Sequence, residues 1–505
     1  MKRLLHIIVA LTMVGLTFQS CKKETLNNQN EEDSPVLSDE QEKLLMDSTY
    51  LLTYQFSLWN KPNMPEPTKA SDLRAYTKNF KSAEEVLASL MALTPKIGPN
   101  TQPVDRFSFI DRTNRVGEQI GQGIHRDLGL SLQALIFNEA SREVGVVIRL
   151  TQKNSPAANS GLKRGMRVIS VDGELLKLTV SADNRIEGNV DVANKLYSGN
   201  VSKVGVRDLA TGSESDITIQ GNSTYTLNPI LENKVITLDA GNKKVGYLAY
   251  TSFVSVISNQ QPNRFHQDLT AAFNTFSGAG IDELVVDLRY NGGGETNAAQ
   301  LLTNLIIPTG NNGKIMYSYM MNELLTKSGF TDANRSDAPF KPVYVNKSNS
   351  LNLKRVYFLV TSSSASASEL VINALKPYMD VQIISIGNRG TYGKPVGSFG
   401  RAVMSNSARL YITSFKMANA AGEGDYFNGL IGTKNNSRDT YTEALGSEKE
   451  QMLSDALYHI ANGSYRATTS SNAQAKLNKS TSSLNTPIAV DLFVDKQVQG
   501  LYKLN

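Results

Sequence analysis

The chain has 505 residues, which is enough for about three domains of roughly 150 residues each. Hydrophobic residues make up 40% of it and charged residues 20%, a composition that is ordinary for a globular protein. The formal charge of +5 is small for this length, and no basic patch is interleaved with aromatic residues, so nucleic acid is not an expected partner.

Residues 1–20 have the pattern of an export signal. Lys2 and Arg3 form a short positive region, and an apolar run of 13 residues follows at 4–16, which is too short to span a bilayer comfortably. The small residue Ser20 then precedes Cys21, the only cysteine of the chain. This ending resembles a bacterial lipoprotein signal, in which the cysteine is acylated and becomes the new N-terminus. An ordinary signal peptide with an incidental cysteine is the alternative.

Acylation of Cys21 would locate the protein in a bacterial cell envelope, on the periplasmic side or at the cell surface. Each buried CH₂ group contributes about 0.8 kcal/mol, so several acyl chains hold a soluble domain on a membrane. No later apolar stretch reaches the roughly 18 residues of a spanning helix, so the mature chain is expected to sit on the membrane without crossing it. A single cysteine also excludes an intramolecular disulfide.

Two segments lead from the signal into the folded part of the chain. Residues 21–37 are polar and turn-rich, which predicts a flexible tether. Residues 38–110 predict a small helical domain, because EQEKLLMDSTYLLTYQFSLW and SAEEVLASLMALT place apolar residues at spacings of three and four. Ser38 and Ser82 are the expected helix N-caps, since acidic residues follow each of them in the next turn.

Residues 115–222 predict a compact module of short strands. The stretches VGVVIRL and RVISVDG are expected strands, and the second is closed by an Asp172-Gly173 turn. Between them SPAANSG predicts a short helix that ends at Gly161.

This order of strand, SPAA-type helix and strand resembles a PDZ domain, with Met166 where that family usually has Asp. The resemblance implies that backbone N–H groups around Leu128, Gly129 and Leu130, in the segment DLGLSL, hold the C-terminus of a peptide. A β-sandwich without a ligand is the alternative.

Residues 223–465 alternate between strand and helix patterns, which predicts an α/β core. Expected strands are VGYLAYTSF, ELVVDLRYN, RVYFLVT, VQIISIG and ARLYITSF, and expected helices are NRFHQDLTAAFNTFSGA, SASELVINALKPYM and KEQMLSDALYHIAN. The tail, residues 466–505, is rich in Ser, Thr, Asn and Ala, and its apolar stretch PIAVDLFV could dock as an edge strand.

The segment VYFLVTSSSASASELVINALKPYM contains a candidate nucleophile. A serine at a strand-to-helix turn has an exposed hydroxyl near free helix N–H groups, which stabilise an anion. A Ser/Ala run before a helix is, however, more often only an N-cap and a loop. The four histidines, His6, His125, His266 and His459, lie in no recognisable triad context, so a Ser–His–Asp arrangement has little support.

A lysine can replace histidine as the base when burial disfavours its charged form. Lys394, in SIGNRGTYGKPVGSF, follows an expected strand and lies among glycines. A strand, a helix and a strand separate it from the serine run, so the two loops can meet at one edge of a parallel sheet.

The glycines Gly292, Gly293 and Gly294 of VVDLRYNGGGETN follow a buried strand and precede a helix. Glycines at such a turn allow backbone N–H groups to point inward as an oxyanion hole, where one donor is worth about 3 kcal/mol in acyl transfer. A simple glycine-rich turn is the alternative. The segment is not a nucleotide-binding loop, because no G-K-[ST] follows.

Together these segments resemble the C-terminal processing peptidases, or tail-specific proteases. The family pattern of D-L-R-x-N-x-G-G, S-A-S-A-S-E and T-x-G-K is present as DLRYNGGG, SASASE and TYGK, in that order. The resemblance includes the PDZ-like module and so spans about residues 115–465. It implies an α/β protease core of ββα units like those of ClpP and crotonase, with an inserted PDZ-like β domain and a small N-terminal helical domain.

The resemblance also implies the roles of individual residues. Ser366 would be the nucleophile and Lys394 its base, and the N–H groups of Ala367 and Gly293 would stabilise the oxyanion. Many members carry a Gln four residues after the lysine, where this chain has Ser398. A hydroxyl at that position can still accept a hydrogen bond from the lysine, so activity is expected.

The sequence thus predicts a serine endopeptidase that cleaves proteins or peptides near their C-termini through an acyl-enzyme. No cofactor or metal is expected, because neither H-E-x-x-H nor clustered Cys/His spacing is present. A weak or inactive peptide-binding lipoprotein is the second hypothesis, and an acyl hydrolase of small esters is the third. The sequence gives no oligomeric state.

Overall fold

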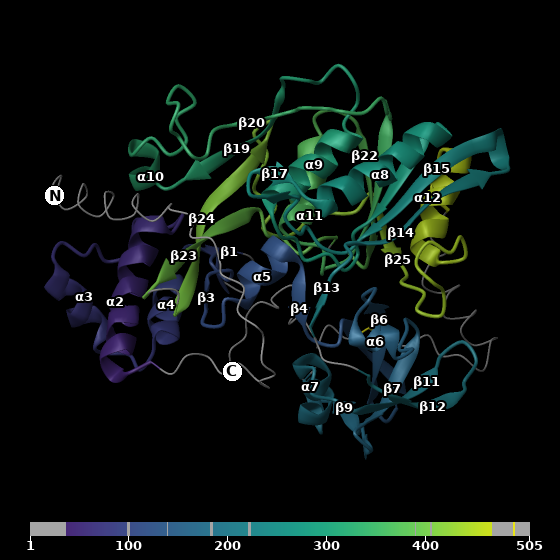
Figure 1. Ribbon diagram of the computed structural model, residues 1–505, viewed down its shortest axis with the longest axis horizontal. Coiled ribbons are helices and arrows are strands. Elements are labelled where there is room, and N and C mark those ends of the chain that lie inside the picture. The colour runs from purple at the N-terminus through teal and green to yellow at the C-terminus, as the bar shows by residue number, and fades with distance from the viewer. Residues whose placement is uncertain are drawn as a thin grey trace. The chain divides into compact units, whose positions relative to one another are not determined.

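Figure 1 shows a computed structural model of the chain, which describes residues 37–97, 102–138, 140–181, 185–220, 224–388, 390–404, 407–466 and 488–489. The predicted export signal, Cys21 with nearly all of the predicted tether, and most of the tail lie outside the described residues. The chain divides into two compact units, residues 1–114 with 398–413 and residues 115–397 with 414–505. In the described ranges, no helix is both long enough and apolar enough to cross a membrane.

Among the described residues of the first unit, two of the three helices begin at the predicted caps, and the third begins after Lys69. Ser38 Oγ accepts a hydrogen bond from Gln41 N, and Ser38 N–H donates to Gln41 Oε1, at 3.3 and 2.9 Å. Ser82 Oγ accepts from Glu85 N at 3.3 Å, so both predicted N-caps are confirmed. The elements are α2 (Asp39–Phe56), α3 (Ala70–Thr77), α4 (Ala83–Met91), β1 (Lys96–Ile97), β2 (Gln102–Pro103) and β3 (Phe109–Asp111).

The second unit begins with several runs of consecutive strands and alternates between helices and strands from about residue 264 to residue 386. From residue 115 to 226 its elements are α5 (Arg115–Gln122), β4 (Ile124–Arg126), β5 (Leu130–Asn138), β6 (Glu143–Thr151), α6 (Pro156–Asn159), β7 (Met166–Val171), β8 (Glu174–Leu175), β9 (Leu178–Val180), β10 (Ile186–Gly188), α7 (Val190–Ser198), β11 (Lys203–Asp208), β12 (Glu214–Thr218) and β13 (Thr224–Thr226).

From residue 230 onward the elements are β14 (Ile230–Leu238), the 3₁₀ turn η1 (Ala240–Asn242), β15 (Lys243–Tyr250), β16 (Ile257–Ser258), β17 (Gln261–Pro262), α8 (Arg264–Ala279), β18 (Glu283–Asp287), α9 (Thr296–Ile306), β19 (Ile315–Met321), α10 (Glu323–Lys327), β20 (Val343–Tyr344), β21 (Arg355–Val360), α11 (Ala367–Leu375), β22 (Asp380–Ile386), β25 (Lys434–Ser437), α12 (Gln451–Asn462) and β26 (Ile488–Ala489). Strands β23 (Val396–Val403) and β24 (Ala408–Asn419) run through both units.

Strands β5 to β12, together with α6 and α7, form a module that we call the β module (residues 130–218). Its sheet has the order β10-β9-β6-β7-β11-β12, with β5 on β6 and β8 on β7. The predicted strands and short helix of this stretch are confirmed as β6, β7 and α6. Asp172 and Gly173 both have positive φ, 51° and 83°, as a tight two-residue hairpin turn requires.

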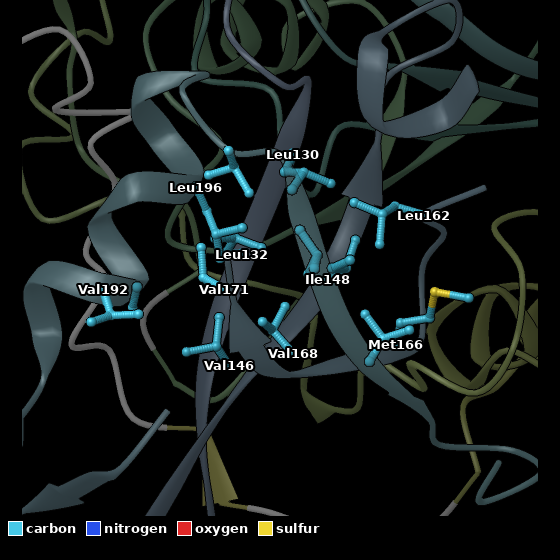
Figure 2. Close-up of a cluster of buried hydrophobic side chains, with 14 of the residues drawn as sticks. Leu130, Leu132, Val146, Ile148, Leu162, Met166, Val168, Val171, Val192 and Leu196 are labelled. Atoms are coloured by element: carbon cyan, nitrogen blue, oxygen red, sulfur yellow. The ribbon is translucent and has the colours of Figure 1, made fainter. Parts of the chain in front are cut away.

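The β module has its own hydrophobic core. In Figure 2 side chains from three strands and from α7 point toward one centre. Because alternate residues of a strand face the same side, Leu130 and Leu132 of β5 meet Val146 and Ile148 of β6 there. Val168 and Val171 of β7, with Val192 and Leu196 of α7, complete this centre.

The central sheet of the second unit has six strands in the order β14-β15-β18-β21-β22-β25. Only the β14–β15 pair is antiparallel, and the four pairs from β15 to β25 are parallel. Helix α12 covers one face, where Met452 and Ala456 pack on Tyr247, Val285 and other buried side chains (Figure 1). The predicted α/β core is therefore confirmed as a mixed α/β fold.

Strand β24 extends from one unit into the other. In the first unit Arg409–Tyr411 pair antiparallel with β3, and in the second unit Phe415–Asn419 pair antiparallel with β19. In the second unit β19 also pairs antiparallel with β20. Strand β26 pairs antiparallel with β5, so the two described residues of the tail's apolar stretch, Ile488 and Ala489, form an edge strand, as predicted.

Candidate active site

Three loops follow the neighbouring parallel strands β18, β21 and β22. The first contains the glycine run and leads into α9, and the second contains the serine run and leads into α11. The third contains Lys394 and leads into β23. Carboxyl ends of adjacent parallel strands lie at one edge of a sheet, and active sites of open α/β sheets are built there.

Ser366 is the last residue before α11 and has φ 56° and ψ −111°. A positive φ is unfavourable for a residue with a side chain, and such strain is concentrated at functional sites. Ser366 is the only serine of the described residues with this conformation. The hydroxyls of its neighbours Ser364 and Ser368 instead donate to the main-chain oxygens of Leu288 and Asn291, at 2.7 and 2.8 Å. The hydroxyls of these two serines therefore stabilise the loop through hydrogen bonds to the main chain. The half-buried Ser366 remains the candidate nucleophile.

The carboxyl group of Glu369 joins the serine loop to the lysine loop. Its Oε2 accepts hydrogen bonds from the backbone N–H groups of Ser366 and Lys394, at 2.9 and 2.8 Å. Its Oε1 accepts from Gly393 N at 2.7 Å and from Thr391 Oγ1 at 2.6 Å. Because one oxygen atom receives both amides, the main chains of the predicted nucleophile and the predicted base are immediate neighbours.

Glu369 is fully buried. Burial raises the pKa of its carboxyl group above the ordinary value, while the hydrogen bonds from Thr391 and from the three amides act in the opposite direction. All four neighbours of the carboxyl group are donors, and an ionised carboxylate is an acceptor only, so this environment suits the ionised form. Losing the carboxylate would leave several buried donors without an acceptor.

Gly293 touches the nucleophile from the glycine loop. A Cβ atom on this residue would lie 2.8 Å from Ser366 Cβ and 3.1 Å from Ala367 N, which is too close for any side chain. Its φ of 107° also favours glycine. The Gly293 N–H, however, donates to Asn291 Oδ1 at 2.9 Å, so this predicted oxyanion donor already has an acceptor. The buried Ala367 is the first residue of α11, and its donor role stays a prediction.

The remaining predicted site residues lie outside these three loops. Ser398 lies on β23 and belongs to the first unit, whereas Lys394 belongs to the second, and its predicted hydrogen bond stays a prediction. Leu128, Gly129 and Leu130 are buried at the start of β5. Cys21 is outside the described residues.

The histidines of the described residues lie on other elements than the three loops. His125, His266 and His459 lie on β4, α8 and α12, away from the three loops in sequence and element. Within the described ranges, no three side chains of His, Cys, Asp or Glu gather as metal ligands would.

A family model, Peptidase family S41, matches residues 244–431, which include all three loops. The chain contains a peptidase family S41 domain. Carboxyl-terminal-processing peptidase 3, chloroplastic, of Arabidopsis thaliana is 23% identical over 324 residues. That match covers 62% of this chain and 53% of the relative, so the chain spans about half the length of the curated relative it matches.

Two solved structures of proteases align with this chain. A structure assigned to the S41 proteases, from Bacteroides fragilis, aligns with a TM-score of 0.61 at 22% identity, over 86% of this chain and all of that one. The photosystem II D1 C-terminal processing protease aligns with a TM-score of 0.44 at 18% identity, over 83% of this chain and 100% of its own. The first of these confirms the S41 peptidase fold.

Three residues of the S41 domain site had no role in the sequence-based prediction. Glu369 ends the SASASE motif and Thr391 begins TYGK, and both were part of the quoted patterns. Asn291 precedes the glycine run, and its main-chain oxygen accepts from Ala365 N and Ser368 Oγ. A serine followed three residues later by Glu is the ordinary capping-box signature, so the sequence signal for Glu369 was present but pointed only to a helix start.

Replacing Glu369 tests the joint between the two loops. In Glu369→Gln the amide NH₂ faces donors, so at least one buried N–H loses its acceptor, at a cost of about 1–3 kcal/mol. We expect kcat for peptide cleavage to fall at least about tenfold, with KM changing less, because the reacting groups are displaced. Glu143→Gln, on the half-exposed Glu143–Arg167 pair of the β module, is the matched control. Unchanged kcat in a folded Glu369→Gln variant would show that the hydrogen bonds of Glu369 do not hold Ser366 and Lys394 in their reactive positions.

Proposed function

We propose that the protein is a serine-type endopeptidase that cleaves protein or peptide substrates near their C-termini, with Ser366 as nucleophile and Lys394 as base. The observation that carries this proposal is the single oxygen of Glu369 that accepts from both Ser366 N and Lys394 N within the S41 domain. The strained backbone of Ser366 supports its assignment over the neighbouring serines.

Acylation would begin when the neutral amine of Lys394 takes the proton from Ser366 Oγ. The oxygen then forms a bond to the carbonyl carbon of the scissile peptide, and the electron pair of the C=O bond moves to the carbonyl oxygen. When the C–N bond breaks, the ammonium group of Lys394 gives its proton to the leaving amine. The amine of Lys394 next takes a proton from water, and the water oxygen forms a bond to the ester carbon. The bond between that carbon and Ser366 Oγ then breaks, and the ammonium group of Lys394 returns the proton to Ser366 Oγ.

The oxyanion needs donors close to Ser366. The Ala367 amide lies at the start of α11, where the helix dipole also favours negative charge. For Gly293 to act as the second donor, its N–H must turn away from Asn291 Oδ1 or be shared with it. The positive φ values of Gly293 and Gly294, 107° and 139°, belong to residues whose peptide planes can rotate at low cost.

The other parts of the proposal concern location and substrate capture. We propose that the β module is a PDZ-like domain that holds the C-terminal part of a substrate, and that residues 38–110 form a separate N-terminal helical domain. Acylation at Cys21 would anchor the protein in a bacterial cell envelope, facing the periplasm or the exterior. Ser398 would support Lys394 in place of the Gln of many relatives.

The alternative function is that of a catalytically weak peptide-binding lipoprotein. It is suggested by Ser398, which occupies the position where many relatives have Gln. The match to the S41 domain and the intact joint at Glu369 do not favour it.

Alanine substitutions of the dyad test the proposed activity. We expect Ser366→Ala and Lys394→Ala each to lower cleavage of an unfolded protein at least about a thousandfold, because either change removes a group that acts in bond formation. Ser362→Ala, in the same serine run, and Lys449→Ala, on an exposed lysine, are the matched controls. Gel-based cleavage with purified full-length proteins is the measurement. Equal, nonzero cleavage by the wild type and all four variants would contradict the assignment of Ser366 and Lys394 as the catalytic dyad.

The lipid anchor has a separate test. In a bacterial host we expect the full-length protein to partition into the detergent phase of a phase-separating detergent, since acyl chains contribute about 0.8 kcal/mol per buried CH₂. Cys21→Ala should move the protein to the aqueous phase while cleavage activity in solution is retained. Detergent-phase recovery of Cys21→Ala after signal removal would instead point to attachment by another route.

A further inference from the structure

The glycine loop carries one acidic side chain close to the candidate nucleophile. Gly293, Gly294 and Glu295 are consecutive, and a Cβ atom on Gly293 would lie only 2.8 Å from Ser366 Cβ. Consecutive Cα atoms are about 3.8 Å apart, so the Cα atom of Glu295 lies within about 8 Å of the Cα atom of Gly293. Because the glycines have no side chains, Glu295 provides the first side chain along this loop from Ser366.

Two backbone hydrogen bonds fix the position of Glu295. Phe253 N donates to Gly293 O at 3.0 Å, and Glu295 N donates to Phe253 O at 2.7 Å, so residues 293–295 lie along the segment that follows β15. Between these two bonds, the N–H and C=O groups of Gly294 make no hydrogen bond to the described residues. Since Gly294 is partly exposed and has no side chain, the main chain of a substrate can approach it closely.

The carboxyl group of Glu295 has no cationic partner among the described residues. Glu295 is the N-cap of α9, but its side chain accepts from no helix amide, and no charged side chain affects the pKa of its carboxyl group. Glu450, the N-cap of α12, differs in both respects, because it accepts from Leu453 N at 3.1 Å and pairs with Arg289 at 2.8 Å. Glu295 therefore lacks the partners that stabilise the other glutamate.

Partial burial makes an unpaired carboxylate unfavourable. Burial raises the pKa of the Glu295 carboxyl group above its ordinary value, and no described group opposes this effect. An ionised carboxylate that loses water without gaining a cation or a hydrogen-bond donor costs free energy. A positively charged group of a substrate would lower the pKa again and stabilise the ionised form. A titratable group with a shifted pKa beside an active site is a candidate functional residue.

The acidic side chains closest in sequence to the glycine and serine loops are otherwise paired. Glu369 accepts four hydrogen bonds from the serine and lysine loops. Asp287, at the end of β18, pairs with the buried Arg289 and accepts from the Tyr247 hydroxyl at 2.7 Å. Glu295 is therefore the acidic group of the glycine and serine loops that remains available for a cation.

We propose that Glu295 is a specificity-determining residue that binds the basic side chain of a substrate Lys or Arg close to the scissile bond. The inference rests on the proposed peptidase function and adds a substrate class. These substrates have a basic residue within about three positions of the cleaved bond, since an extended chain advances roughly 3.4 Å per residue. The α-amino group of a substrate carries the same charge, and the test separates this source from a side chain.

Cleavage is measured with the full-length protein and a series of ten-residue peptides that are acetylated at the N-terminus. The parent peptide has norleucine at the positions around the cleaved bond, which mass spectrometry locates, and each relative has Lys at one of these positions. We expect Lys at one position to raise kcat/KM at least about tenfold over norleucine, because the ion pair forms in a partly buried site. Glu295→Gln should reduce this ratio toward one.

Three variants separate the carboxylate from general charge and stability effects. Glu323→Gln removes the same charge from an exposed pair with Lys327 on α10 and should leave the ratio unchanged. Glu295→Asp keeps the charge on a shorter side chain and should give an intermediate ratio, even if Glu295→Gln fails to fold. Glu295→Lys reverses the charge and should favour a peptide with Glu at the same position over its Lys relative.

Equal kcat/KM values for the Lys and norleucine peptides would overturn the proposal, as would a preference for Lys that survives Glu295→Gln. The second probe is a truncated peptide with a free α-amino group at the preferred position. If only this probe is cleaved faster than the acetylated norleucine peptide, the assignment to a side chain is wrong and Glu295 binds an N-terminus.

Ser366→Ala is assayed in parallel with the norleucine peptide and with an unfolded protein. Cleavage that depends on Ser366 but shows no preference for Lys would defeat this inference and leave the proposed peptidase function in place. If the protein that contains Ser366 cleaves no peptide and no unfolded protein, the proposed function fails and this inference fails with it.

Discussion

The geometry of the site depends on one buried carboxylate that accepts four hydrogen bonds. Glu369 lies on the first turn of α11, so its position is fixed by the helix that Ser366 begins. Its two oxygens bind amides of Ser366, Gly393 and Lys394, together with the Thr391 hydroxyl. A polar group this deeply buried is stable only when its partners are in place, so the nucleophile and the lysine loop must be ordered together.

A second buried network, made of ion pairs, positions the segment that leads into the glycine loop. The guanidinium group of Arg289 is paired with Asp287, Glu450 and Asp439, and all four side chains are almost completely buried. Taking such charges out of water is costly, and removing one partner would leave a charge unpaired, so the network disfavours movement of the segment after β18. The Thr361 hydroxyl donates to the main-chain oxygen of Arg289, which ties the serine loop to that position.

The sequence predicted the parts of the site that depend on local pattern and order along the chain. The strands and helices around DLRYNGGG, SASASE and TYGK follow from apolar periodicity, and their meeting follows from the geometry of parallel strands. The engagement of the Gly293 amide by Asn291 could not be predicted, because it depends on the path of the loop in three dimensions. The hydrogen bond from Gly129 N to Asp127 Oδ1 could have been predicted, because an Asp side chain commonly accepts from the backbone N–H two residues later. The role of Glu369 was hidden because the same spacing serves any helix cap.

The central claim is that Ser366 is an activated nucleophile whose place beside Lys394 is set by Glu369. It is tested most directly by labelling the full-length protein with a fluorophosphonate probe and locating the adduct by peptide mass spectrometry over time. A single adduct on Ser366 is predicted, forming at least about tenfold more slowly in Glu369→Gln, as the loss of roughly 1.4 kcal/mol of alignment would produce. An adduct on another serine, or labelling of Ser366 at the same rate in both proteins, would contradict the claim.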